Sequence, residues 1–390
     1  MTSAPVLQHL AASLPDSGSV TPATLLSRSG PLFVTAPDPS PYLAQQAQLS
    51  RGPSDGHPLR VLTFNLGLLE KRSFLPFGAQ QNPNVPSRRA SISERVLKDD
   101  WDVLLLQEVW DWSDVTRLAE VAERQGYVWF AGSKRHHKHH GLVILVRGDL
   151  ITGAQVRSEG RFADQIRGGR WTGEQTGLGY LTWSFTHAPS QRHLRLSTAQ
   201  LQPHPEHWRI RTLQARQLGL DLAATSPETI VVLGAALYAA PYYPENAFGE
   251  DRGEPVSGWW QSALTWPMLQ LYGNLLDTRT LGHALGDVQA MHAIPDWNPG
   301  WPKRPMNGDC PMLPPHIFTT TDCNSLHFRA RGGRDYPARS DHVFFRAPDG
   351  AVGVFQTGLA YVQPEVLRSG RHELSDHYGV QVELRIQPSL

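Results

Sequence analysis

The sequence has few cysteines, no long apolar run and no excess of charge of either sign. Its two cysteines, Cys310 and Cys323, lie close together in a loop-like stretch. We expect two reduced thiols there, because the alternative, a loop-closing disulfide, requires an oxidising compartment. No apolar segment approaches the length of a membrane span, so the sequence predicts no transmembrane segment.

The N-terminal residues and the charge balance limit the classes of partner that we expect. Met1–Val20 lacks a basic segment followed by an apolar core, so no signal peptide is evident and a cytoplasmic location is favoured. Lysine plus arginine equals aspartate plus glutamate, at 36 each. Nonspecific binding of nucleic acid is therefore not favoured, although a local basic groove stays open as an alternative. The sequence carries no signal of oligomeric state.

Composition divides the chain into an N-terminal segment and one large domain. Residues 1–57 are rich in Pro, Ser, Ala and Gly, and we expect an extension or linker there. Residues 58–390 mix strand-like and helical patterns without a linker, which predicts one α/β domain with two packed sheets. A stretch rich in Trp, Pro, Gly and Asn, at about 239–305, interrupts this pattern as an insertion.

Apolar periodicity predicts two further features of this domain. A helix after residue 207 is expected to bury one apolar stripe, made of Ile210, Leu213, Leu220 and Ala224. Residues 342–346 and 352–356 read as two strands, and the turn Pro348-Asp349-Gly350 between them predicts a hairpin.

Polar side chains stand at the ends of several apolar strands of the predicted domain. They are Asn65, Glu108, Asp341, and the pair Asp376 and His377 before the last strand. Amide and carboxylate oxygens suit Mg²⁺ or Mn²⁺, and phosphate hydrolysis uses such a cation to offset charge on the phosphoryl oxygens. A neighbouring histidine can stabilise the same charge or protonate a leaving oxygen. The pattern therefore predicts metal-assisted phosphate chemistry.

Three segments around these residues resemble signatures of the endonuclease/exonuclease/phosphatase superfamily, in the family's order. They are Thr63-Phe64-Asn65, Leu106-Gln107-Glu108-Val109 and Ser375-Asp376-His377-Tyr378-Gly379-Val380. The chain is most similar to the neutral-sphingomyelinase-like and DNase I-like branches. The resemblance implies a four-layer α/β-sandwich with two packed, mostly antiparallel sheets flanked by helices.

The resemblance also implies roles for the polar residues. Asn65, Glu108 and Asp376 would surround the metal, and His377 would lie beside the scissile phosphate. Asp341 would be a supporting carboxylate on its strand. From the residues alone, a salt bridge from Asp341 to Arg339 or Arg346 is an equal alternative.

The chain departs from the family pattern at three positions. Gln200 stands where the family has a phosphate-contacting histidine, and Ala235 and Leu237 stand for the Asp and Asn of a Gly-Asp-x-Asn segment. Glutamine carries no proton, and alanine and leucine offer neither charge nor hydrogen bond. A shifted alignment that brings in His204 or His207 is the alternative.

These substitutions favour a degenerate or weak divalent-metal-dependent phosphodiesterase, so whether the protein is an enzyme stays open. The alternative is an active Mg²⁺-dependent phosphodiesterase, sphingomyelinase-like or a nuclease, with a non-standard base. In either case the expected ligand is a phosphodiester or a phospholipid headgroup.

Two other groups of residues have both a functional and a structural interpretation. The histidines around Lys138 could bind a metal, but we expect a solvated loop: His136, His137, His139 and His140. Four tryptophans in the insertion could meet a lipid interface, but we expect them to pack onto the domain: Trp259, Trp260, Trp297 and Trp301.

Overall fold

The computed structural model describes most of the predicted domain and, of the predicted N-terminal segment, only residues 55–57. The described residues are 55–68, 84–133, 140–165, 178–203, 207–239, 271, 275–277, 340–361, 365–368 and 370–389. All of them lie in the unit Asp38–Leu390, and the second unit, Met1–Pro37, lies outside them. The predictions for Cys310, Cys323, the four tryptophans and most of the insertion also fall outside the described residues.

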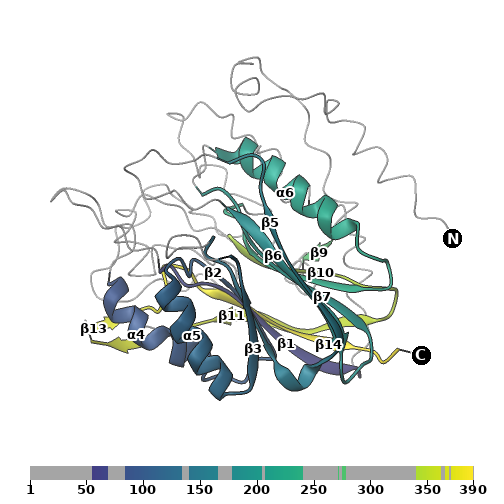
Figure 1. The fold of residues 1–390 in the computed structure, drawn as a ribbon, viewed down its shortest axis with the longest axis horizontal. Helices are drawn as coiled ribbons and strands as arrows, with labels where there is room; N and C mark the ends of the chain where they lie inside the picture. Colours follow the sequence, from purple (N-terminus) through teal and green to yellow (C-terminus); the bar gives the residue numbers. More distant parts are fainter. Residues whose placement is uncertain are drawn as a thin grey trace, which may run out of the picture. The chain divides into compact units, whose positions relative to one another are not determined.

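The first sheet has six strands in the order β11-β14-β1-β2-β4-β3 (Figure 1). Their bounds are β1 His57–Asn65, β2 Val103–Gln107, β3 Tyr127–Ala131, β4 Val143–Arg147, β11 Val352–Ala360 and β14 Gly379–Ile386. The pair β1 and β2 is parallel, and the other neighbours are antiparallel. The last strand alternates as the sequence predicts, with Val380, Val382, Leu384 and Ile386 buried.

The second sheet also has six strands, in the order β5-β6-β7-β8-β10-β9. Their bounds are β5 Ile151–Arg161, β6 Gly179–His187, β7 His193–Gln200, β8 Ile230–Ala236, β9 Leu276–Asp277 and β10 Asp341–Arg346. Only β7 and β8 pair in parallel among the described neighbours. The strands β12 (Glu365–Leu367) and β13 (Gly370–His372) form a separate antiparallel hairpin, and the 3₁₀ turn η1 (Gly148–Leu150) connects β4 with β5.

The two sheets pack face to face, and helices cover their outer faces. The inner core joins residues of both sheets, among them Val61, Leu105, Trp183, Leu196 and Val232. On the outer face of the first sheet, Leu62, Leu104 and Leu106 pack against α4 (Val85–Val96) and α5 (Trp112–Arg124). Helix α6 (Trp208–Ala223) lies along the second sheet (Figure 1). The predicted four-layer α/β-sandwich with mostly antiparallel sheets is confirmed.

The buried stripe predicted for α6 is wrong. The helix buries Arg211, Gln214, Ala215, Leu218, Gly219 and Leu222, while Leu220 is 61% exposed. Polar residues occupy the buried face because the loop before the helix satisfies them. Gln214 Oε1 accepts the backbone N–H of Gln202 at 2.7 Å, and Arg211 Nη1 donates to the carbonyl of Gln202 at 3.0 Å. Apolar periodicity cannot anticipate such contacts.

The predicted hairpin across Pro348-Asp349-Gly350 is also wrong. The turn exists, with Gly350 at φ 70° and the N–H of Ala351 bonded to the carbonyl of Pro348. However, β10 pairs with β8 in the second sheet, whereas β11 pairs with β14 in the first. The turn therefore carries the chain from one sheet to the other. Among the described residues, no helix is long and apolar enough to span a membrane.

Candidate active site

The ends of two neighbouring parallel strands bring Asn65 and Glu108 together. Asn65 ends β1 and pairs with Gln107, the last residue of β2, so Glu108 follows at the same edge of the sheet. Glu108 adopts a left-handed backbone conformation, with φ 58°. Such a conformation is uncommon for a residue with a side chain and turns the chain sharply after the strand. Asn65 Nδ2 then donates to Glu108 Oε1 at 3.0 Å.

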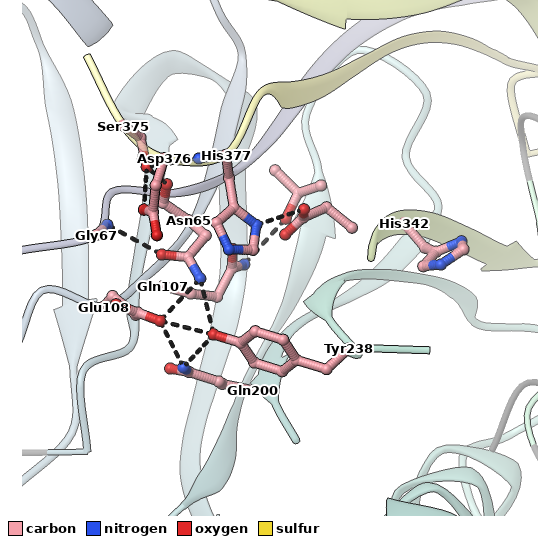
Figure 2. Close-up of polar contacts among 12 residues, drawn as sticks. Asn65, Gly67, Gln107, Glu108, Gln200, Tyr238, His342, Ser375, Asp376 and His377 are labelled. Carbon is pink, nitrogen blue, oxygen red and sulfur yellow. Dashed lines mark hydrogen bonds and ion pairs between the residues drawn. The ribbon is translucent and has the colours of Figure 1, made fainter. Parts of the chain in front are cut away.

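One residue of the second sheet and one that follows it complete a group around this carboxylate, which we call the Glu108 cluster: Asn65, Glu108, Gln200 and Tyr238. Gln200, the last residue of β7, donates from Nε2 to Glu108 Oε1 at 3.0 Å. Tyr238, shortly after β8, donates its hydroxyl to the same oxygen at 2.7 Å. Figure 2 shows the three donors converging on one carboxylate oxygen. Burial, and then the charge of Glu108, raise the pKa of Tyr238 well above its ordinary value, so its hydroxyl stays protonated.

A buried histidine–aspartate pair lies beside the cluster. His377 Nδ1 is 2.7 Å from Asp341 Oδ2, and the ring of His377 meets the ring of Tyr238 edge-on at 5.8 Å. Burial alone lowers the pKa of His377, but the charge and hydrogen bond of Asp341 outweigh it and raise the pKa to about 9. The structure therefore shows His377 as a partner of Asp341. The guanidinium of Arg346 instead donates to carbonyls near the end of α6. Arg339 lies outside the described residues.

Arg88 of α4 connects the loop that follows Asn65 with the loop that carries Asp376. Its guanidinium is fully buried and donates to the carbonyls of Leu66, Gly67 and Leu374. Burial lowers the pKa of Arg88 to about 10, while Asp376 and Glu108 act in the opposite direction. The residue therefore remains a cation at neutral pH, and it fixes the loop after β1 against the loop before β14.

Gln107 connects the two sheets directly beneath the cluster. Its Nε2 donates to Thr63 Oγ1 on β1 and to Thr198 Oγ1 on β7, both at 2.9 Å. The side chain is fully buried. Because Gln200 follows Thr198 by two residues on the same strand face, this contact sets the height at which Gln200 meets Glu108.

The structure brings most of the predicted site residues together. Asn65, Glu108 and Gln200 are in direct contact, and His377 contacts Asp341. Asp376 lies at the loop of Gly67, where a Cβ atom would collide with Asp376 Oδ1, and Ser375 Oγ donates to that oxygen at 3.2 Å. Of the alternative histidines, His207 immediately precedes α6 and His204 lies outside the described residues.

Ala235 is placed differently from Gln200. In the sheet, Ala236 pairs with both Gln200 and Asp341, whereas Ala235 pairs with Ala199 and His342. Since side chains alternate along a strand, Ala236 shares the face of Gln200 and Asp341, and Ala235 points to the opposite face. Figure 2 accordingly shows His342 apart from the cluster. Leu237 is fully buried, and the residue of this segment that reaches the cluster is Tyr238.

Sequence reasoning missed Tyr238 and Arg88. Tyr238 adopts a left-handed conformation, with φ 48°, that no local pattern announces, and Arg88 lies on a helix where arginine commonly faces solvent. A signal for Tyr238 did exist. Residues 234, 236 and 238 are spaced two apart, so along a strand they would face the same side. A Cβ atom at Gly234 would meet Thr63 and Leu105 of the facing sheet, which is the side of the cluster.

The residues of the cluster do not fit a divalent cation on Glu108 Oε1. That oxygen already accepts three N–H or O–H donors. Asn65 Oδ1, the atom that would bind a metal, accepts the backbone N–H of Gly67 at 2.9 Å, which leaves the amide nitrogen facing Glu108. A hard cation needs oxygen ligands rather than donors. In the described parts of the chain, no three His, Cys, Asp or Glu side chains form a group able to hold a metal.

Comparison with known proteins identifies the family. The sequence model of the Endonuclease/Exonuclease/phosphatase family matches residues 62–377, which include every polar residue of the site described above. The chain belongs to this family. A comparison with curated proteins finds no match.

Solved structures of this family share the fold at low sequence identity. The structure of D. rerio TDP2 complexed with single strand DNA product has 17% identity and a TM-score of 0.55, over 84% of this chain and 99% of that one. SmcL has 14% identity and a TM-score of 0.53, over 84% and 99%. The human Nocturnin catalytic domain with bound sulfate anion has 14% identity and a TM-score of 0.51, over 85% and 94%. At these identities the likeness shows the fold alone.

Proposed function

We propose that this family member binds a phosphate ester beside His377 and hydrolyses it weakly or not at all. The observation that carries the proposal is the pair of His377 and Asp341, whose Nδ1 and Oδ2 atoms are 2.7 Å apart. The pair lies next to the Glu108 cluster, in which Gln200 and Tyr238 both act as hydrogen-bond donors. Asp341 uses Nδ1 of the imidazole, so Nε2 is the nitrogen left for a ligand oxygen. In Figure 2 this second nitrogen lies on the side of Asn65 and Tyr238.

The weak hydrolysis follows from the groups that surround Glu108. Water attacking a phosphate ester needs a group that orients it and accepts its proton, and removal of such a base costs about 10²- to 10⁴-fold in rate. Gln200 cannot accept that proton, Ala236 has no polar atom, and Tyr238 stays protonated. On the face of the second sheet that Gln200 shares with Ala236, the described residues around Glu108 therefore offer no base in place of the family's polar groups.

Relatives with the same fold support the ligand class. A sulfate anion is bound in the human Nocturnin structure, and a DNA product is bound in the D. rerio TDP2 structure. Both ligands carry tetrahedral anionic groups. The Mg²⁺ or Mn²⁺ expected from the family is a separate matter, because the proposed binding uses His377 and does not require a cation.

The test is binding and turnover of bis(4-nitrophenyl) phosphate by the full chain. We expect saturable binding that is weakened about tenfold or more in His377→Asn, which corresponds to about 1.4 kcal/mol. His193→Asn, at an exposed histidine on the opposite end of β7, serves as the matched control and should bind like the parent. Release of 4-nitrophenolate should stay near the uncatalysed rate with or without Mg²⁺.

Two results would contradict the proposal. Absence of saturable binding, or binding that His377→Asn leaves unchanged, would remove the ligand assignment. Mg²⁺-dependent turnover of this ester, of plasmid DNA or of sphingomyelin that disappears in Asp376→Ala would instead establish an active phosphodiesterase with a non-standard base.

A further inference from the structure

In the Glu108 cluster, every contact described above to Glu108 Oε1 comes from a hydrogen-bond donor. Two of the donors are amides, from Asn65 and Gln200, and the third is the phenol of Tyr238 at 2.7 Å, the shortest of the three contacts. A carboxylate that accepts several hydrogen bonds has its charge stabilised in the way that a metal ion would stabilise it. The arrangement is thus complete without a cation at this oxygen.

The donors differ in how readily they could give way to a metal. An amide can turn by half a rotation and offer its oxygen, so Asn65 and Gln200 contain a ligand atom in either orientation. Gln200 Oε1 in particular is buried and has no hydrogen-bond partner among the described residues. Tyr238 has only its protonated hydroxyl, which donates to Glu108 Oε1 at 2.7 Å and so occupies the position of a cation on that oxygen.

The backbone holds Tyr238 in this position at a cost. Both Tyr238 and Glu108 have positive φ angles, 48° and 58°, and each such conformation costs about 1 kcal/mol or more for a residue with a side chain. The ring of Tyr238 is also fixed edge-on against His377, at an angle of 90°. Both partners of the Tyr238–Glu108 hydrogen bond therefore have an uncommon backbone conformation, which indicates that the rest of the fold stabilises this contact.

We propose that the hydroxyl of Tyr238 takes the place of a divalent cation on Glu108, so that cation binding and the Tyr238–Glu108 hydrogen bond exclude each other. The inference does not depend on the proposed phosphate-ester binding. It assigns to Tyr238 the function of a built-in substitute for the metal.

The experiment measures Mn²⁺ binding by calorimetry and by the electron paramagnetic resonance signal of free Mn²⁺. We expect no saturable site in the parent chain. Tyr238→Phe keeps the ring and removes only the hydroxyl, and we expect it to gain one Mn²⁺ site at least about tenfold tighter than anything in the parent, about 1.4 kcal/mol. Adding Glu108→Gln to this variant should abolish the gain, because the ligand charge is lost.

Several results would overturn the proposal. A Tyr238→Phe variant that melts like the parent but gains no site would show that the hydroxyl is not what excludes the cation. A gain that survives Glu108→Gln would place the metal elsewhere. The parent chain provides a test that does not need the variant. If the parent has a saturable Mn²⁺ site and Glu108→Gln removes it, a cation binds Glu108 while Tyr238 is present, and the proposal is wrong.

Discussion

The α-carbon of Gly67 lies directly against the carboxylate of Asp376, so that a methyl group at position 67 would collide with Asp376 Oδ1. Gly67 also has φ 57°, a conformation that favours glycine. The loop after the first strand and the loop before the last strand therefore fit together only because residue 67 has no side chain.

Substitution of Gly67 by alanine is expected to displace Asp376. The clashing atom is the end of a flexible side chain, so the carboxylate rather than the backbone should move. We expect Gly67→Ala to lower stability by about 1 kcal/mol through the positive φ and also to weaken phosphate-ester binding. Gly126→Ala is the matched control, because Gly126 has φ 81° and nothing within 4 Å of a Cβ atom.

The comparison of the two glycine variants separates strain from the site. Both should lose similar stability in urea unfolding, and only Gly67→Ala should lose affinity for bis(4-nitrophenyl) phosphate. Equal affinity in the two variants would mean that Asp376 does not contribute to the site.

Restoring the family residues is expected to depend on which face of β8 they occupy. Ala236 pairs with Gln200 and Asp341, so Gln200→His, Ala236→Asp and Tyr238→Asn together place the missing groups on the face of the cluster. We expect this triple variant to raise Mg²⁺-dependent release of 4-nitrophenolate. The variant Gln200→His with Ala235→Asp and Leu237→Asn should not do so, because Ala235 faces away. Higher activity in the second variant would show that the face was assigned wrongly.

Removal of the Gln107 amide is expected to destabilise the contact between the sheets. Gln107→Leu leaves the buried hydroxyls of Thr63 and Thr198 without their shared donor, which should cost about 1–3 kcal/mol of unfolding free energy. Gln155→Leu on the exposed strand β5 is the control and should change stability by less than about 0.5 kcal/mol. Urea unfolding measures both, and equal effects would mean that the Gln107 contacts contribute nothing specific.

The stability of the fold is expected to fall between pH 6.5 and about pH 4, because burial keeps His187 neutral in the folded chain. Burial, and then the charge of His57, lower the pKa of His187 from 6.5 to about 4. Below pH 6.5 the imidazole of residue 187 therefore binds a proton in the unfolded chain, whereas in the folded chain it stays neutral down to about pH 4. The contribution of the neutral imidazole is complete above pH 6.5 and is lost as the pH falls towards 4, at about 1.4 kcal/mol per pH unit.

A substitution at His187 isolates this effect from other titrating groups. His187→Asn retains a donor near Ser190, which contacts Nδ1 of the imidazole at 2.7 Å, but it does not titrate. The free energy of unfolding of this variant should fall less steeply between pH 6.5 and 4 than that of the parent. Parallel curves for the two proteins would refute the assignment.

The sequence predicted the fold and the convergence of strand-end residues because both follow from local patterns. Asn65 and Glu108 end apolar strands, and neighbouring parallel strands end at one edge of a sheet. It failed where the outcome depends on distant contacts. The turn at Pro348-Asp349-Gly350 has the residues of a hairpin, yet only the pairing partners β8 and β14 determine that it crosses between sheets.

The site was predictable only in part for the same reason. The pairing of His377 with Asp341 and the hydrogen bond of Gln200 to Glu108 require both sheets to be in register. Tyr238 reaches Glu108 through a positive φ angle that its neighbours in the sequence do not specify. A motif read from the sequence identifies which residues belong to the family pattern, but the sheet decides which of them face the same space.

The pairing of β1 with β14 has a consequence for the nascent chain. His57 of β1 lies opposite Ile386 of β14, so β1 is synthesised long before the strand that closes this edge. Until then, the unpaired N–H and C=O groups of β1 are a template for pairing with another chain. Asp376 and His377 lie just before β14, so a chain truncated before them lacks the strand that closes this edge of β1 and also these two residues of the site.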